Sequence, residues 1–352
     1  MLFRKKDHLV GLDIGSSFIK VAELKISKKG KILKKFGVAQ VPSGAIVEGR
    51  VIDKRGVANI IRTLFKSQKI KEKNVAISTG GHSVVIKTIT TAKVPGKELH
   101  TTIHSEAEQY IPYDIDDVNI DYQILGESEF SLDQMNVLLV AVKKDLVAEY
   151  IDLLSLAGLT PSIIDVDTFA LQNIYEVLPD SDPETVTLLV DVGASKTSLN
   201  ILKGNISLMM RDNVSGTDQI LEELSGQLDI SIEEAENMVS AGNPDQKDSK
   251  TIAEISHHIA NSWCSEICEA VDTFQTSNKE KKVEKIVLSG GGGFVEGFLD
   301  SLKSELNVEV VGINPFEGLI LDKKRFPDSF ISGIGLQAPI ALGLALRRMD
   351  DK

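Results

Sequence analysis

Hydrophobic and polar residues alternate with a period of two over residues 9–24 and 31–41, on either side of a lysine-rich turn. This alternation is typical of a β-hairpin with one buried face. Apolar residues at helical spacing over Arg55–Ser67 then predict a helix, and Asn74–Thr79 has the pattern of a strand that runs into a glycine turn. The order strand, strand, helix, strand predicts one half of an α/β lobe spanning residues 1–83.

The pattern changes over residues 84–159, where a strand, a helix, two strands and a second helix are expected in turn. Because this order does not continue the first lobe, it predicts an inserted α+β subdomain. The expected strands are Val84–Thr90, Val118–Leu125 and Met135–Val142, and the expected helices are Lys97–Tyr110 and Lys144–Ala157.

The second half of the chain predicts a second α/β lobe. A strand over Ile163–Asp167 and a helix to Val177 return the chain to the first lobe over residues 160–184. Turn-forming residues at Pro179–Pro183 mark a boundary, and residues 185–352 form the second lobe. Its helical part covers about 217–280 and is interrupted at Ala241–Asp245. Two lobes are also what 352 residues favour, since a single core rarely grows that large.

Two turns with the same composition lie about half the chain apart. Asp13-Ile14-Gly15-Ser16-Ser17 follows one apolar run, and Asp191-Val192-Gly193-Ala194-Ser195 follows another. A glycine after a strand lets backbone N–H groups approach a phosphate, and the preceding aspartate can hold a hydrated divalent cation. A single Asp-x-Gly is usually an ordinary turn. The matched pair predicts that two related half-molecules clamp one phosphate chain.

A third glycine-rich segment, Gly290–Gly293, separates the apolar run Lys285–Ser289 from a helical pattern over Phe294–Leu299. Glycines at such a junction leave the backbone open to close approach by a flat ligand. A flexible linker is the alternative. It fits poorly, because buried-type patterns adjoin the glycines on both sides without a polar spacer.

Composition and charge narrow the class of protein. Hydrophobic residues make up 42% and charged residues 26%, which is typical of a globular protein. Residues 1–82 carry 18 Lys and Arg against 6 Asp and Glu, whereas residues 83–352 carry 21 against 45. Much of the basic charge lies in Lys25–Lys35. A solvated hairpin tip is the favoured explanation, followed by an anionic membrane surface or acidic partner, with nucleic acid last because few aromatic residues accompany the lysines.

Cys264 and Cys268 share one face of a helical pattern and are interpreted as an idle thiol pair rather than a disulfide or metal site. No apolar stretch approaches the roughly 20 residues needed to span a bilayer. The charged N-terminus does not resemble a signal peptide. We therefore expect a cytoplasmic protein that reaches a membrane only through a partner.

Segments along nearly the whole chain resemble the PilM family, the actin-like proteins of type IV pilus assembly. The N-terminal segments Phe3–Lys6 and Val10–Ser17 are similar to the start of that family. The inserted subdomain carries the most specific likeness, and two later segments extend it. These further segments are Glu106–Tyr113, Val118–Leu125, Val137–Lys144, Ala157–Pro161, Asn314–Phe316 and Ala341–Arg347. The resemblance implies two actin-like (ribonuclease-H-like) lobes around a nucleotide cleft, with an inserted subdomain of the kind shared with the division protein FtsA.

The resemblance also implies a site for ATP and Mg²⁺. Asp13 and Asp191 would hold the metal, and the phosphates and nucleoside would contact residues of the glycine turns and their surroundings. The implied nucleotide-binding residues are Gly15, Ser16, Ser17, Lys20, Gly193, Ala194, Ser195, Gly216, Glu236, Gly290, Gly291 and Gly292. For Lys20, an ordinary surface strand position is an equal alternative.

The implied catalytic carboxylates are Asp191 and Asp165. Asp165 stands where DnaK-type relatives carry a longer glutamate that orients water, although a role as helix cap or connecting-strand residue fits it equally well. Val239 stands where relatives often have a lysine that reaches the nucleoside. Both departures predict at most a slow ATPase.

As function, the resemblance implies a cytoplasmic adaptor that binds the short cytoplasmic N-terminal tail of PilN, in an assembly with PilO and PilP. The groove would lie between the first lobe and the acidic insert. An FtsA-like membrane tether is the alternative, but residues 346–352 directly follow a core-type helix and form no amphipathic anchor. A sugar or acid kinase is less favoured, because the sequence shows no second substrate pocket. A homo-oligomer remains open.

Overall fold

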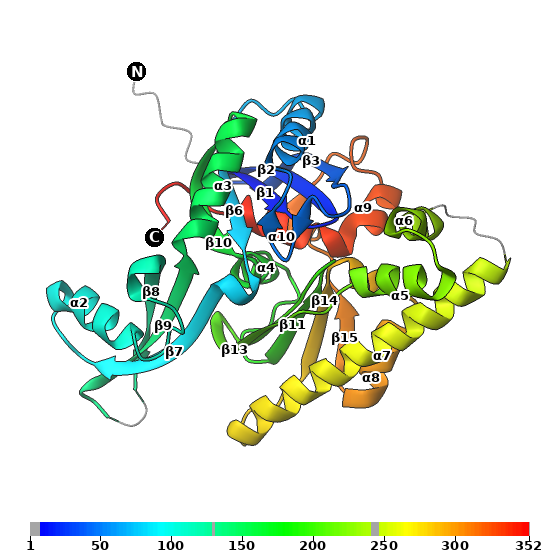
Figure 1. The fold of residues 1–352 in the computed structure, drawn as a ribbon. Coiled ribbons are helices and arrows are strands. Elements are labelled where there is room, and N and C mark those ends of the chain that lie inside the picture. Colours follow the sequence, from blue (N-terminus) through cyan, green and yellow to red (C-terminus); the bar gives the residue numbers. More distant parts are fainter. Residues whose placement is uncertain (1–7, 129–130, 241–245, 352) are drawn as a thin grey trace.

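The computed structural model describes residues 8–128, 131–240 and 246–351, which form two α/β lobes and a smaller sheet beside the first lobe (Figure 1). The first lobe is built on a six-stranded sheet with the order β10-β6-β1-β2-β3-β16. Its strands are β1 (Val10–Ile14), β2 (Phe18–Ser27), β3 (Gly30–Gln40), β6 (Asn74–Thr79), β10 (Thr160–Val166) and β16 (Leu319–Ile320). The two-residue turn between β2 and β3 lies within the lysine-rich segment, as the alternation predicts.

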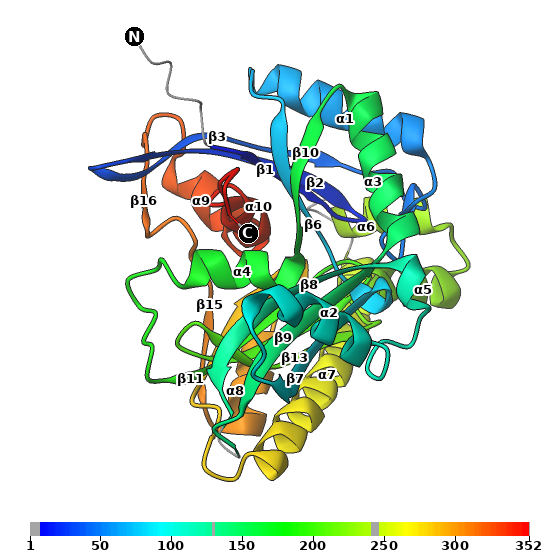
Figure 2. The same cartoon turned by 90° about the vertical axis from the view of Figure 1, so that its left-hand side faces the viewer.

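Helices cover both faces of this sheet (Figure 2). One face carries α1 (Lys54–Ser67) and α3 (Lys144–Ala157), and the other carries α4 (Asp167–Tyr175) and α10 (Pro339–Leu344). α1 begins where the Asp53 carboxylate accepts a hydrogen bond from the Gly56 N–H at 2.9 Å, which satisfies one of the free donors at the helix start. α10 approaches β1 closely, because a Cβ on Gly11 would lie 2.1 Å from the Ala341 carbonyl oxygen.

The second lobe repeats this arrangement on a five-stranded sheet with the order β13-β12-β11-β14-β15. β11 pairs antiparallel with β12 and parallel with β14, as β1 pairs antiparallel with β2 and parallel with β6. The repeat confirms the predicted pair of actin-like lobes. The strands are β11 (Val186–Val192), β12 (Thr197–Lys203), β13 (Ile206–Asn213), β14 (Lys285–Ser289) and β15 (Glu309–Gly312).

The helices of the second lobe pack mainly on one side of its sheet. The long helix α7 crosses that side (Figure 1), and its Trp263 packs edge-on against Phe298 of α8. The helices on this side are α5 (Asp218–Leu228), α6 (Ile232–Ser240), α7 (Gln246–Ser277) and α8 (Phe298–Leu306). The short helix α9 (Asp328–Ile334) instead packs its Phe330 against Phe36 of the first lobe. The predicted interruption at 241–245 and the N-terminal segment 3–6 lie outside the described residues.

The inserted subdomain is an antiparallel sheet with the order β7-β9-β8, and α2 (Gly96–Ala107) packs against it. Its strands are β7 (Val84–Ala92), β8 (Val118–Glu127) and β9 (Gln134–Lys143). The expected C-terminal limit at 159 differs from the structure. α3 belongs to the first lobe, because Leu146, Leu153 and Leu154 lie in the same core as Leu12 of β1. The helical period predicted α3, but it carries no information on which core receives the apolar face.

The C-terminal part of the chain also differs from the expected division, in which all of 185–352 formed the second lobe. β16 pairs with β3, and α10 packs on β1 and α4 of the first lobe. A shared core joins both lobes here, with Phe36 of β3 against Phe316 and Leu342. The short hairpin β4 (Ile46–Val47) and β5 (Arg50–Val51) completes the first lobe next to α3.

Candidate functional site

The first of the two matched turns connects β1 to β2. Asp13 lies near the end of β1, and the next strand places Lys20 directly opposite it. The Lys20 Nζ lies 3.0 Å from Asp13 Oδ2. The Gly15 N–H donates to the Phe18 carbonyl oxygen at 3.2 Å, and a Cβ on Gly15 would lie 2.9 Å from that oxygen. The turn is therefore too tight for a larger residue, and it leaves the Ser16 and Ser17 side chains at the surface of the cavity described below.

The second turn connects β11 to β12 in the same way. The Gly193 N–H donates to the Lys196 carbonyl oxygen at 2.9 Å. Asp191 lies near the end of β11, and its Oδ1 accepts a hydrogen bond from the Ser289 hydroxyl of β14 at 2.6 Å. Each lobe thus contributes one aspartate at the carboxyl end of a central strand, followed by a tight turn.

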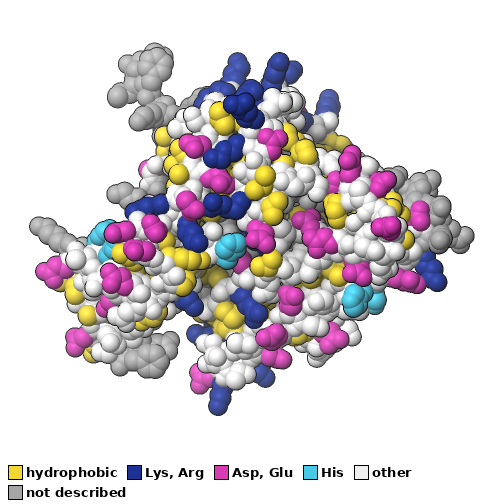
Figure 3. Space-filling model, in the orientation of Figure 1, with side chains coloured by type: hydrophobic (Ala, Val, Ile, Leu, Met, Phe, Trp, Pro, Cys, Tyr) yellow, Lys and Arg dark blue, Asp and Glu magenta, His cyan; other side chains and the backbone are white. Residues whose placement is uncertain are grey.

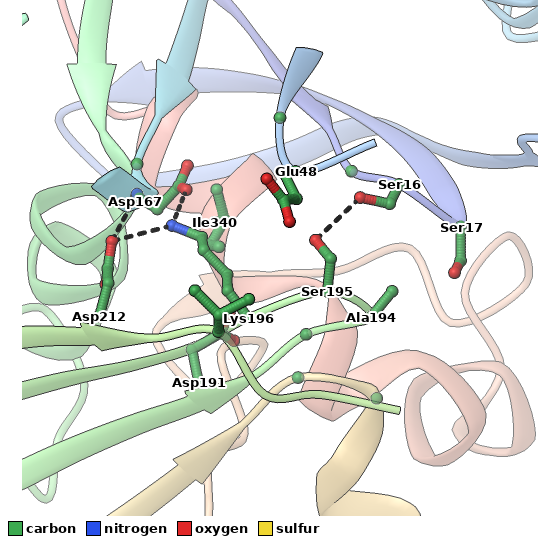
Figure 4. Close-up of a pocket in the computed structure, with 18 of the residues that line it drawn as sticks. Ser16, Ser17, Glu48, Asp167, Asp191, Ala194, Ser195, Lys196, Asp212 and Ile340 are labelled. Carbon is green, nitrogen blue, oxygen red and sulfur yellow. Dashed lines mark hydrogen bonds and ion pairs between the residues drawn. The ribbon is translucent and has the colours of Figure 1, made fainter. Parts of the chain in front are cut away.

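The two turns face one another across the lobes. The hydroxyl oxygens of Ser16 and Ser195 lie 3.0 Å apart, and both side chains point into the space between the turns (Figure 4). A cavity of about 910 Å³ begins here and extends to Val85, Tyr110 and Pro112 at the edge of the inserted sheet. The sequence predicted that the turns would meet. It did not predict that the same cavity would reach the insert.

Most of the expected site residues line this cavity. They are Asp13, Gly15, Ser16, Ser17, Lys20, Asp191, Gly193, Ala194, Ser195, Glu236, Gly290 and Gly291. Val239, expected at the nucleoside, also lines it. The pairing of Lys20 with Asp13 inside the cavity excludes the alternative of an ordinary surface strand position for Lys20.

Gly216 and Gly292 do not line the cavity and instead allow close packing behind the second turn. A Cβ on Gly216 would lie 2.3 Å from the Ala194 carbonyl oxygen, and one on Gly292 would lie 2.3 Å from Val192 Cγ1. Gly290 is similarly tight, because its φ is +87° and a Cβ there would lie 2.2 Å from the Val192 carbonyl oxygen. Gly290 and Gly292 let the segment after β14 pack against Val192 of β11, and Gly216 lets the segment after β13 pack against the backbone of the second turn.

Asp165 does not reach the cavity, contrary to the expected role in orienting water. Its Oδ2 lies 3.3 Å from the Arg347 Nε, and its Oδ1 accepts from the Val166 N–H. The predicted strand over 163–167 ends one residue early, because Asp167 begins α4. That change of backbone turns Asp167 into the cavity instead. Asp165 is thus a connecting-strand residue, which was the stated alternative.

Sequence reasoning missed a group of charged residues beside the second turn. Lys196 follows the turn, and its Nζ lies 2.7 Å from Asp167 Oδ2 and 3.4 Å from Asp212 Oδ2 (Figure 4). Glu48, from the β4–β5 hairpin, points toward the same space (Figure 4). Asp167 and Asp212 lie 45 positions apart in the chain, and only the fold brings them to one ammonium group. In the sequence, the one indication of this charged group is Lys196 itself, which directly follows the second turn.

Burial changes the pKa values of the charged side chains in the site. It raises the pKa of Asp191 to about 6, and it raises the pKa of Asp13 despite the neighbouring Lys20. For Asp167, burial opposes ionisation, but the Lys196 ammonium together with smaller contributions, among them the Lys20 charge, holds the pKa of that carboxyl below its usual range. Burial likewise opposes the charge on Lys196, and Asp167 and Asp212 raise its pKa nonetheless. Burial also raises the pKa of Asp218, which lines the same cavity, to about 6. A nearby cation would therefore stabilise the charged forms of Asp13, Asp191 and Asp218.

The described residues contain no helix long and apolar enough to cross a membrane. Nor do they hold a group of three or more His, Cys, Asp or Glu placed to bind a metal by themselves. Cys264 is buried, and burial raises the pKa of its thiol to about 12, which agrees with an idle residue.

Comparison with known proteins finds solved structures that are similar to nearly the whole chain. A solved structure described as "PilM-PilN type IV pilus biogenesis complex" is 28% identical with a TM-score of 0.84, and the match covers 97% of this chain and 98% of that one. The ethanolamine utilization protein EutJ from Carboxydothermus hydrogenoformans is 13% identical with a TM-score of 0.56, over 96% of this chain and 89% of that one. A diol dehydratase-reactivating factor is 9% identical with a TM-score of 0.54, over 97% and 99%.

The last two likenesses concern the fold alone. A family model described as type IV pilus assembly protein PilM matches residues 11–349, which include both turns, the insert and α10. The chain therefore belongs to the PilM family of type IV pilus assembly proteins.

Proposed function

We propose that this protein is a nucleotide-binding adaptor of the type IV pilus assembly machinery. It binds Mg-ATP between the two matched turns and a short tail of the membrane protein PilN beside the insert. The observation that supports this most directly is the cavity of about 910 Å³, which has Asp13 and Ser195 at one end and Tyr110 and Pro112 at the other. Pockets of this size and mixed polarity are where proteins bind small molecules and short segments.

The residues present suit a phosphate chain with a hydrated Mg²⁺. Asp13 and Asp191 would hold the ion through water, and the turn backbones with Ser16 and Ser195 would donate hydrogen bonds to phosphate. The raised pKa values of both carboxyls favour a nearby divalent cation, because it would offset the cost of burying their charge. Few protein ligands suffice, since Mg²⁺ commonly keeps several waters and takes phosphate oxygens.

Hydrolysis is at most slow in this proposal. Asp165 pairs with Arg347 outside the cavity. Asp167 lines the cavity, but its lowered pKa and its ion pair with Lys196 make it a weak base. We expect a turnover below about 1 s⁻¹, the low end of ordinary enzymes. Phosphate release is the measurement.

PilN is the proposed partner because the similar solved structure is a PilM-PilN complex. Exposed Asp114, Asp116 and Asp117 stand close to the cavity-lining Pro112 in sequence, and they would attract a basic tail. We place the adaptor on the cytoplasmic side of the inner membrane, in an assembly with PilO and PilP. An FtsA-like division tether is less supported, since the family match is to pilus assembly proteins.

Calorimetry tests both parts. The protein should bind Mg-ATP and a peptide of the PilN cytoplasmic tail, and the double variant Asp13→Ala with Asp191→Ala should lose the dependence of ATP binding on Mg²⁺. Unchanged Mg²⁺ dependence in the variant would refute the metal assignment. Absence of tail binding, with a division-protein tail bound instead, would support the tether alternative.

A further inference from the structure

Lys196, Asp167 and Asp212 come from three separate elements and meet inside the proposed phosphate site. Lys196 follows Ser195 in the turn before β12, Asp167 begins α4, and Asp212 lies near the end of β13. The three side chains are partly buried, with 24%, 15% and 24% of their surfaces exposed. The Lys196 ammonium group therefore contacts two carboxylates. A phosphate bound by the second turn would lie close to the same ammonium group.

The two ion pairs are unequal. The Lys196 Nζ lies 2.7 Å from Asp167 Oδ2, which is a close charge-assisted contact, but 3.4 Å from Asp212 Oδ2. Asp212 also accepts a hydrogen bond from the backbone N–H of Gly81, at the start of the chain's path into the insert. Asp212 would thus keep a hydrogen-bond donor if Lys196 moved away, whereas Asp167 holds its lysine closely. The contact of Lys196 with Asp212 is the longer of its two ion pairs.

Resting on the proposed nucleotide site, we propose that Asp212 competes with the terminal phosphate of a nucleoside triphosphate for Lys196. Phosphate is the more highly charged partner, and its oxygens accept several hydrogen bonds from an ammonium group. The competition lowers the affinity for triphosphate more than that for diphosphate, because the diphosphate has no terminal group to reach Lys196. Asp212 is thereby a specificity-determining residue that limits the preference of the site for ATP over ADP.

The proposal predicts opposite effects from two members of one ion-pair network. Lys196→Met should lower the affinity for Mg-ATP about tenfold, as expected for a lost hydrogen bond to a charged group. Asp212→Asn should raise it about threefold, the effect of removing one partly exposed ion pair from Lys196. Affinity for Mg-ADP should change less in both variants. A purely structural network would instead lose affinity in both.

A double-variant cycle separates competition from a general effect of charge. If Asp212 acts by occupying Lys196, then Asp212→Asn gives no gain in Mg-ATP affinity once Lys196 is methionine. If Asp212 merely repels the nucleotide, the gain is the same in both backgrounds, and that result would overturn the inference. Equal gains for Mg-ATP and Mg-ADP would overturn it as well.

The exposed pair Lys203–Glu184 supplies matched controls, because Lys203 ends the strand β12 that directly follows Lys196, and the pair, 3.3 Å apart, does not line the cavity. Lys203→Met and Glu184→Gln should leave both affinities unchanged. Thermal melting of each variant monitors folding. If Lys196→Met does not fold, the Asp212→Asn variant still tests the inference through its ratio of Mg-ATP to Mg-ADP affinity. A ratio equal to that of the unaltered protein would reject the inference. If the unaltered protein binds neither nucleotide, the proposed function itself fails, which is a distinct result.

Discussion

At the scale of single residues, two aspartates two positions apart have different surroundings. Asp165 and Asp167 are equally acidic in the sequence, and a strand over both would point them to the same side. Because α4 begins at Asp167, one carboxylate pairs with Arg347 and the other lines the cavity. The end of a strand is among the least predictable local features, and here it decides which acid faces the proposed ligand.

The raised pKa of Asp191 makes stability depend on pH in a defined direction. In the folded protein this carboxyl has a pKa of about 6, against 3.8 for an ordinary exposed aspartate, so ionisation costs stability above pH 4 and costs most above pH 6. Asp191→Asn should therefore stabilise the protein at pH 8 by up to about 3 kcal/mol, because each tenfold change in a proton-binding constant corresponds to about 1.4 kcal/mol. The gain should vanish near pH 4. Urea unfolding at both pH values is the measurement.

Asp182 provides a control of opposite sign. Hydrogen bonds from the Glu184 N–H and then the Thr185 hydroxyl lower the pKa of this exposed carboxyl. Asp182→Asn should not stabilise the protein at pH 8. A loss of stability at pH 8 in Asp191→Asn would contradict the interpretation that burial dominates at Asp191.

At the scale of elements, neighbouring glycines of Gly290–Gly293 have different constraints. Gly290 has a φ of +87°, and a Cβ on it would press on the Val192 carbonyl oxygen. The nearest heavy atom to a Cβ on Gly291 is the Gln337 Nε2 at 3.6 Å, which is an ordinary contact. The four glycines in the sequence indicate that the backbone of this segment lies close to another group. The packing of β11 against β14 shows that Gly290 is a position at which a side chain would clash with Val192.

Alanine substitutions should separate these two glycines. Gly290→Ala should destabilise the protein by about 2 kcal/mol or more, from left-handed backbone strain and the clash with Val192. Gly291→Ala should leave the free energy of unfolding nearly unchanged, which makes it the matched control. Chemical denaturation of both variants is the test, and equal stabilities would show that the turn can shift away from β11.

The two ends of the inserted subdomain lie next to each other in the structure. Its first and last strands meet, because Val84 is paired with Val142 across β7 and β9. Excision of residues 84–143 therefore joins two neighbouring points of the chain. Excision to 159 would also remove α3, whose Leu153 and Leu154 are fully buried in the first lobe.

We expect the shorter excision to abolish binding of the PilN tail while Mg-ATP binding and a cooperative melting transition remain. The longer excision should lose the transition as well, because it leaves the core beneath α1 open to water. Circular dichroism melting, with calorimetry for both ligands, distinguishes the two. Retained tail affinity in the shorter variant would place the groove elsewhere.

At the scale of the whole molecule, charge is distributed unevenly. Lys and Arg side chains gather over the upper part of the first lobe, around α1, while acidic side chains predominate over the rest of the visible face (Figure 3). The lysines of the β2–β3 hairpin do not form one flat surface. Lys25 is opposite Ile32 and Lys31 is opposite Ile26, so Lys25 and Lys31 point to different sides of the sheet.

Because the hairpin lysines are divided between two faces, the protein alone should bind anionic liposomes only weakly. Several lysines on one face could each contribute roughly 1 kcal/mol near such a surface, but the acidic remainder of the chain opposes close approach. Sedimentation with anionic liposomes at physiological salt should leave most of the protein in solution. Substantial co-sedimentation would indicate direct attachment and would favour the tether alternative. Liposomes that display the PilN tail are the positive control.

The local features of this protein could be predicted from its amino-acid sequence. Alternation and helical spacing predicted most strands and helices, and the two Asp-x-Gly turns predicted a repeated half-molecule with a clamp between its halves. These features depend on neighbouring residues, and local backbone preference and side-chain direction follow directly from them.

The contacts between distant segments could not be predicted and are seen in the folded molecule alone. It assigned α3 and α10 to the first lobe, moved Asp165 out of the cavity, and brought Lys196 to Asp167 and Asp212. An amphipathic helix fits any complementary apolar face, and an acidic residue gives no sign of the lysine it will meet. Such pairings depend on strand order, on the residue at which a strand ends and on packing across the chain, which no local pattern encodes.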